Sequence, residues 1–82
     1  MPFVATVNVM LKDGIADPQG QTIERALPAL GFSGVADVRV GKRIRLAVDA
    51  ADEQEAREQV QQMCERLLSN PVIESYEVTL ES

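Results

Sequence analysis

Apolar residues alternate with other residue types along residues 3–11. The odd-numbered positions, from Phe3 to Leu11, are all apolar. This period of two predicts a β-strand with one face packed on a core. The even-numbered positions mix apolar with polar residues. Because this second face is not fully polar, we expect it to make a second contact, with another chain.

A helix is predicted to begin at Asp17 and Pro18. An aspartate N-cap accepts backbone N–H groups, and proline at the first helical position loses no hydrogen bond. Apolar residues then follow at the spacing of one helical face, namely Ile23, Ala26, Leu27 and Leu30. Gly31 suits the left-handed position after a helix. Pro28 interrupts the pattern, so we expect a kink or an early change of helical geometry there.

Two further strands are expected over residues 35–40 and 43–49, because apolar residues alternate with charged ones in both. Gly41 and Lys42 separate these strands. Glycine at the first central position favours a type II′ hairpin turn, in which Gly41 has a positive φ. The two strands are therefore predicted to pair with each other.

The second helix is predicted to begin at Asp52, with Glu55 three residues later as in a capping box. Its apolar stripe consists of Ala56, Val60, Met63, Cys64, Leu67 and Leu68. Asn70 is expected in the left-handed cap position, and Pro71 prevents continuation of the helix. A last strand is predicted over residues 72–80, with Tyr76 on its apolar face.

The element order predicts an α+β fold: a two-layer βαββαβ sandwich, with a four-stranded antiparallel sheet and two helices on one face. Residues 1–82 are expected to form a single domain. The second sheet face would carry Val4, Met10 and Ala47, and this is the face on which we expect another chain. A domain this small gains stability from oligomerisation.

Composition argues against most kinds of catalytic chemistry. The formal net charge is −5, which is the wrong sign for nucleic acid, and the 82 residues include no His and one Cys. A metal site and His-based acid–base catalysis are therefore not expected. The chain begins without a signal-like segment and has no apolar run long enough to span a bilayer. With one unpaired cysteine, we expect a cytoplasmic protein.

Two features could carry chemistry, and each has a simpler interpretation. Cys64 falls within the apolar stripe of the second helix, so we interpret it as a core residue and not as a nucleophile. The segment from Asp17 to Gly20 could bind an anion at a helix N-terminus. Asp17 itself caps those N–H groups, however, and capping is the interpretation we favour.

Three segments give the chain a specific resemblance. They are Asp17-Pro18-Gln19-Gly20 leading to Gly31-Phe32, then residues 35–42 ending in Val40-Gly41-Lys42, and then Cys64-Glu65 through Asn70-Pro71-Val72-Ile73-Glu74. In order and spacing, from Phe3 to Leu80, they resemble the PurS family. Pro28 departs from this resemblance, because the family usually has an ordinary helical residue at that position.

The resemblance implies a non-catalytic subunit of bacterial phosphoribosylformylglycinamidine synthase, a complex of purine biosynthesis. In that complex a PurQ-type subunit releases ammonia from glutamine. A PurL-type subunit, which holds ATP and magnesium, forms formylglycinamidine ribonucleotide from formylglycinamide ribonucleotide. PurS-like chains form homodimers, possibly dimers of dimers, that bridge the two subunits and assist ammonia transfer. No cofactor is expected on this chain itself.

Within this interpretation the candidate partner-binding residues are Gln19, Arg39, Lys42 and Glu74. Arg39 could instead form an ion pair with Asp37 or with an acidic residue of a neighbouring strand. The positions expected to shape the motif are Asp17, Pro18, Gly20, Gly41, Asn70 and Pro71. The alternative function is an ACT-like module that binds an amino acid at a dimer interface, with Lys12-Asp13-Gly14 as a short version of the required turn.

Overall fold

The computed structural model describes residues 1–81 of the chain. Three strands form one antiparallel sheet in the order β2-β1-β3, so β1 is the central strand. Strand β1 pairs Phe3 with Val48 on one side and Ala5 with Leu80 on the other. The elements are β1 (Pro2–Leu11), α1 (Pro18–Ala26), the 3₁₀ turn η1 (Pro28–Leu30), β2 (Gly41–Asp49), α2 (Glu53–Met63), the π-helical turn η2 (Cys64–Leu68) and β3 (Glu74–Glu81).

The core lies between the sheet and α2, which contacts all three strands. The predicted period-two face of β1 supplies the centre of this core. The buried apolar residues are Phe3, Ala5, Val7, Val9, Val48, Ala50, Ala56, Val60 and Cys64. Cys64 has no exposed surface, as its place in the apolar stripe predicts. Burial and the neighbouring Glu65 raise the pKa of the Cys64 thiol.

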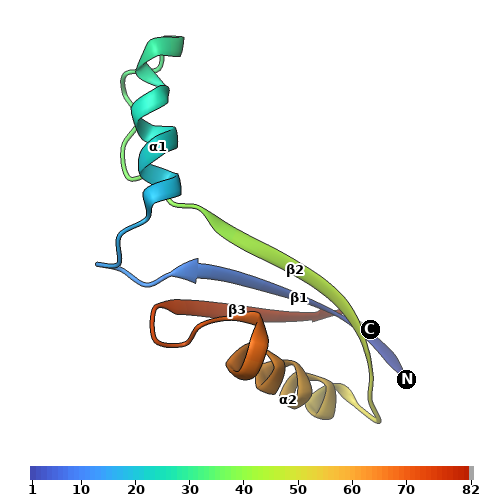
Figure 1. Ribbon diagram of the computed structural model, residues 1–82. Coiled ribbons are helices and arrows are strands. Elements are labelled where there is room, and N and C mark those ends of the chain that lie inside the picture. The colour runs from blue at the N-terminus through green and yellow to red at the C-terminus, as the bar shows by residue number, and fades with distance from the viewer. Residues whose placement is uncertain (82) are drawn as a thin grey trace.

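Helix α1 does not cover the sheet, and the prediction of two helices on one face was wrong in this respect. Figure 1 shows α1 projecting beyond the end of the sheet, with the segment after it running back alongside the helix. We call residues 13–40 the arm. With the arm extended, the molecule measures 52 × 25 × 14 Å. Residues 1–81 therefore form one sheet and two α-helices, and α2 is the helix that packs on the sheet.

The predicted strand over residues 35–40 is absent from the sheet, so the sheet has three strands and not four. Asp37 has a φ of 58°, which ends any extended run. The N–H groups of Val38 and Val40 are taken by carboxylates of Glu24 and Asp17, respectively. Backbone donors that a strand would give to its neighbour are thus used inside the arm.

The predicted hairpin at Gly41 and Lys42 was also wrong. Gly41 is the first residue of β2, where it pairs with Met10. Among residues 1–81, the glycines with positive φ are Gly14 and Gly31. The chain continues past Gly41 without turning back, so the arm is carried away from the sheet.

The start and end of the first helix follow the sequence signals. Asp17 is the N-cap, Pro18 is the first helical residue and Gly31 is left-handed with φ of 97°. The α-helix ends at Ala26 and a 3₁₀ turn begins at Pro28. This is the early change of geometry expected where a proline ring would clash with the preceding turn.

The second helix begins as predicted and ends differently. The Glu55 N–H donates to the Asp52 carboxylate over 2.8 Å, which is the expected cap. The last turn is π-helical, and Ser69 donates both its N–H and its hydroxyl to the Cys64 carbonyl. Asn70 is not left-handed, contrary to the prediction, because the extended Ser69 has already ended the helix.

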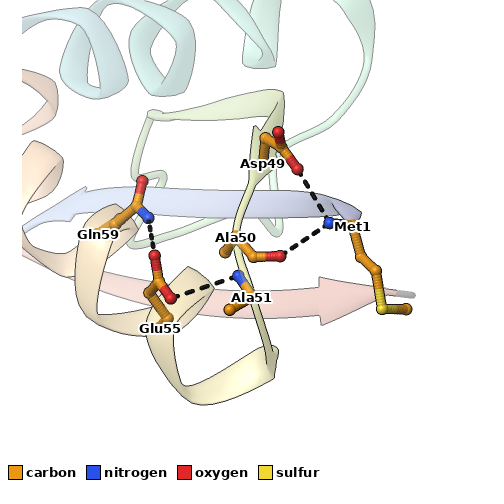
Figure 2. A network of polar contacts seen from close by, with 6 residues as sticks. All are labelled: Met1, Asp49, Ala50, Ala51, Glu55 and Gln59. Carbon is orange, nitrogen blue, oxygen red and sulfur yellow. Dashed lines mark hydrogen bonds and ion pairs between the residues drawn. The ribbon is translucent and has the colours of Figure 1, made fainter.

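A polar network fixes the connection between β2 and α2 (Figure 2). The Met1 ammonium group donates to the Asp49 carboxylate at 3.0 Å and to the Ala50 carbonyl at 2.9 Å. The Glu55 carboxylate accepts the Ala51 N–H and the Gln59 side-chain amide. These contacts hold the start of α2 against the outer end of the sheet, far from the arm.

Candidate functional site at the junction of arm and sheet

A hollow of about 320 Å³ lies where the arm leaves the sheet. Three of the four candidate partner-binding residues share it: Gln19 from α1, Lys42 from β2 and Glu74 from β3. The complete lining is Val9, Leu11, Asp17, Pro18, Gln19, Val40, Gly41, Lys42 and Glu74. The fold thus brings Gln19 close to Glu74, which lies 55 positions later in the sequence.

Asp17 ties the arm together beside this hollow. Its Oδ1 accepts the Gly20 N–H at 2.9 Å, and its Oδ2 accepts the Val40 N–H at 2.8 Å. These two backbone hydrogen bonds, helped by the nearby Arg39 charge, lower the pKa of the Asp17 carboxyl. The helix N-cap is therefore also the anchor for the segment that leads into β2. The Gly20 N–H group at the start of α1 already donates to Asp17, so it is not free to bind an anion. Helix capping therefore explains the sequence of this segment.

Gly20 allows this close approach. A Cβ at position 20 would lie 2.3 Å from the Val38 carbonyl oxygen and 2.8 Å from the Asp17 carboxylate. Backbone cannot yield as a flexible side chain can. Any larger residue would push the returning segment away from α1 and would break the anchor at Asp17.

Arg39 lies next to the hollow but is held by the protein's own backbone. Its guanidinium donates to the carbonyl oxygens of Ile15 at 3.1 Å and Lys12 at 3.2 Å. No ion pair between Arg39 and Asp37 forms within residues 1–81. The intrachain partners of Arg39 are therefore backbone carbonyl oxygens and not the carboxylate of an acidic residue, which was the alternative considered. Through these bonds Arg39 connects the end of the arm to its start.

Glu74, which lines the hollow, is held by the turn between η2 and β3. The Glu74 carboxylate accepts the Asn70 N–H, and the Asn70 carbonyl accepts the N–H groups of Ile73 and Glu74. Lys12 crosses to this turn and donates its Nζ to the Pro71 carbonyl at 2.7 Å. The motif residues Asn70 and Pro71 therefore belong to the turn that positions Glu74.

The candidate side chains around the hollow offer the amide of Gln19, the ammonium of Lys42 and the half-buried carboxylate of Glu74. Such groups suit a polar contact with a protein surface, in which hydrogen bonds and charge complementarity fix orientation. No group of three or more potential metal ligands occurs within residues 1–81. In the same part of the chain no helix is long and apolar enough to cross a membrane.

The sequence pointed to Gln19, Lys42 and Glu74, which lie around the hollow, but it predicted neither the hollow nor the bonds that build it. The cap at Asp17 was predicted, whereas its bond to Val40 was not, because it spans 23 residues. The same holds for the bond between Glu24 and Val38. The only sequence signal for these bonds was the presence of Asp17 and Glu24 in or beside the first helix. The helix was already predicted from its apolar stripe, so these acidic residues did not indicate a further contact.

The chain is similar to known proteins over nearly its whole length. A family model described as "PurS: Phosphoribosylformylglycinamidine (FGAM) synthase" matches residues 4–82. The chain belongs to the PurS family. This assignment decides between the two functions considered above in favour of PurS over an ACT-like module.

Relatives of similar length support the PurS assignment. The PurS subunit of the synthase from Mycobacterium leprae is 47% identical over 79 residues, which cover 95% of each chain. The corresponding subunit from Methanocaldococcus jannaschii is 43% identical over 79 residues, covering 96% of this chain and 95% of the relative. These subunits are named as parts of phosphoribosylformylglycinamidine synthase, a ligase complex.

Solved structures show the same fold. The crystal structure of Methanocaldococcus jannaschii PurS has a TM-score of 0.85 at 42% identity, over 98% of this chain and 96% of that one. A chain in the structure of PurLQS from Thermotoga maritima has a TM-score of 0.89 at 40% identity, over 99% of both chains. High scores over the whole length mean that the projecting arm is part of the PurS fold.

Proposed function

We propose that this PurS chain is the non-catalytic subunit that joins a PurQ-type glutaminase to a PurL-type synthetase and assists the passage of ammonia between them. The observation that carries the proposal is the full-length likeness to a chain of the Thermotoga maritima PurLQS structure. Residues 1–82 act as one domain in this proposal, and copies of the chain associate with each other. The reaction converts formylglycinamide ribonucleotide, ATP and glutamine into formylglycinamidine ribonucleotide, ADP, phosphate and glutamate.

The chemistry of the chain agrees with this assignment. Ammonia transfer needs an organised interface and no nucleophile or base of the subunit's own. The one thiol, Cys64, is buried and its pKa is raised, so it is poorly suited to attack a substrate. We place ATP and magnesium on the PurL-type subunit and the complex in the cytoplasm, where an unpaired cysteine stays reduced.

The hollow at the junction of arm and sheet is the proposed contact with a larger subunit. Lys42 is exposed, and its ammonium group makes no hydrogen bond or ion pair within residues 1–81. Gln19 and Glu74 border the same hollow. A cation flanked by an amide and a carboxylate on an acidic protein suits an acidic patch on the partner.

Assembly with the two partners tests this surface. Mixed with its PurL-type and PurQ-type partners, magnesium, ADP and glutamine, the wild-type chain is expected to elute in a ternary complex in size-exclusion chromatography. Lys42→Ala should leave the melting temperature unchanged and weaken assembly by about 1–3 kcal/mol, as an interface hot spot does. Arg39→Ala should also weaken assembly but lower the melting temperature, because Arg39 holds the arm.

The matched control is Arg45→Ala, which removes an exposed basic residue from the same strand. Arg45 pairs with Thr6, and Lys42 pairs with Val9, so the two side chains lie on opposite faces of the sheet. Arg45→Ala should leave binding at the hollow intact, because Arg45 lies on the second sheet face with Val4 and Ala47. Wild-type affinity of the Lys42 variant would show that the hollow is not the docking surface, and weaker assembly of the Arg45 variant alone would place a contact on the second sheet face instead.

A further inference from the structure

The sheet has a second face, opposite α2, that no element of residues 1–81 covers. The odd-numbered residues of β1 are buried in the core with α2, so its even-numbered residues point to the other side of the sheet. Figure 1 shows α2 on one side of the sheet and the arm beyond its end. We call this second face, formed by alternate residues of the three strands, the open face.

Charged residues of opposite sign line the two edges of the open face. The basic edge consists of Arg43 and Arg45 on β2, and the acidic edge consists of Glu77 and Glu81 on β3. All four are exposed, and none forms an ion pair within residues 1–81. Asn8 of the central strand separates Arg43 from Glu77, which places the two edges about 10 Å apart. The charges are therefore free to meet a partner.

The strip between these edges, formed by β1, is only weakly polar. Val4 is half-buried and Met10 is 39% exposed. Thr6 is 6% exposed although no helix lies over it. Its cross-strand neighbours on β2 and β3 therefore shield it from water. Covering the strip would cost little desolvation and would bury apolar surface at both of its ends.

The dimensions of the open face fit one α-helix. The distance of about 10 Å between the outer strands matches the width of a helix with its side chains, about 10–12 Å. From Val4 to Met10 the strip is about 20 Å long, the length of a helix of about 13 residues. On the opposite face α2 already packs across all three strands in this way.

A second sheet would suit the open face less well than a helix. Sheets that stack face to face bury the whole of their inner faces. Both charged edges would then lose their water, and this desolvation can cost more than the attraction between opposite charges returns. A helix along β1 leaves the charged edges at a solvated rim, as is usual in protein interfaces.

We propose that the open face is a second docking surface, which binds an amphipathic helix of the larger subunit that the hollow does not bind. The apolar side of this helix packs on the strip, its flank over β2 carries acidic residues, and its flank over β3 carries basic ones. The inference rests on the proposed bridging function, because a chain that joins two subunits needs two separate surfaces. Lys42 of the hollow pairs with the buried Val9 and so lies on the other face of the sheet. Both surfaces can therefore be occupied at once.

Charge reversal along β2 tests this surface. The double variant Arg43→Glu/Arg45→Glu should raise the dissociation constant of the complex with the PurL-type and PurQ-type subunits by on the order of 100-fold, because like charges then face each other. Both residues are exposed, so the melting temperature and the oligomeric state of the chain alone should match the wild type. The matched control, Arg43→Lys/Arg45→Lys, keeps both charges and should lose far less affinity.

The outcomes of this experiment separate the inference from the proposed function. Wild-type affinity of the double glutamate variant would overturn docking on the open face and leave the proposed function in place. A smaller oligomer of this variant in light scattering would also overturn it, because a second copy of the chain would then cover the face. Failure of the wild-type chain to form a ternary complex would overturn the proposed function and this inference with it.

Photo-crosslinking identifies the molecule that covers the open face. Benzoylphenylalanine in place of Thr79, an exposed residue between Glu77 and Glu81 at the acidic edge, can react without displacing a helix on the strip. In the assembled complex we expect a crosslink to a PurL-type or PurQ-type peptide with an apolar stripe at helical spacing and charged flanks. A crosslink to a second copy of the chain, or no crosslink in an assembled complex, would overturn the proposal.

Discussion

Omitting this chain from a mixture of the PurL-type and PurQ-type subunits is expected to reduce glutamine-dependent synthesis of formylglycinamidine ribonucleotide to near background. Turnover driven by ammonium salts should be retained. Ammonia released into water is diluted and protonated, whereas ammonia delivered within a complex reaches the synthetase at a high effective concentration. In the proposed function, the chain contributes an interface to this process and no reacting group.

Steady-state rates with glutamine and with ammonium chloride, each measured with and without the chain, check this expectation. Adding the chain back should restore the glutamine rate and leave the ammonium rate unchanged. Loss of both rates on omission would mean that the chain supports the synthetase chemistry directly. A full glutamine rate without the chain would show that it does not couple the two subunits.

Replacement of Gly41 by valine is expected to destabilise the fold by about 1–3 kcal/mol, the usual cost of crowding a well-packed site. A Cβ at Gly41 would lie 2.1 Å from the Met10 sulfur and 2.4 Å from the Val9 carbonyl oxygen. The thioether can move, but the carbonyl belongs to the central strand. The effect therefore comes from close packing and not from a positive φ, which Gly41 does not have.

Gly34→Val is the matched control, because nothing lies within 4 Å of a Cβ at Gly34 and its φ is not positive. Its stability should change by less than about 0.5 kcal/mol. Urea unfolding followed by circular dichroism measures both variants. Equal midpoints for the two would show that the crowding at Gly41 is relieved without cost. Since Gly41 and Lys42 line the same hollow, Gly41→Val should also weaken assembly with the partner subunits.

Local signals in the sequence predicted those parts of the fold whose contacts are local. The alternation along residues 3–11 identified the central strand and its buried face. Asp17 with Pro18 and Asp52 with Glu55 located the starts of both helices. Pro28 located the change to 3₁₀ geometry. In each case the evidence lies within a few residues, where helix caps and period-two patterns act.

The same signals gave wrong predictions where one residue pattern is compatible with two different structures. Residues 35–40 alternate like a strand, and Gly41-Lys42 is typical of a hairpin turn. The carboxylates of Asp17 and Glu24 capture the N–H groups of Val40 and Val38, so the segment follows α1 and not the sheet. The βαββαβ pattern gives the order of the elements along the chain, but it does not determine whether α1 packs on the sheet of its own chain.

The arrangement of the candidate partner-binding residues could not be predicted for the same reason. Gln19, Lys42 and Glu74 were selected by resemblance, and the fold places all three around one hollow. Arg39 was interpreted as a partner-binding residue or as one half of an ion pair. Its bonds to backbone carbonyls depend on the path of the loop after β1, which no residue pattern specifies.

Isotope transfer is the most direct test of the central claim that this chain couples ammonia release to amidine formation. The intact complex is supplied with glutamine labelled with ¹⁵N at the amide, in the presence of excess unlabelled ammonium chloride, and the product is analysed by mass spectrometry. With the chain present, we predict that the amidine nitrogen carries mostly ¹⁵N, because ammonia passes between subunits without mixing with solvent. Dilution of the label to the level of the bulk ammonium pool, despite a fully assembled complex, would contradict the account.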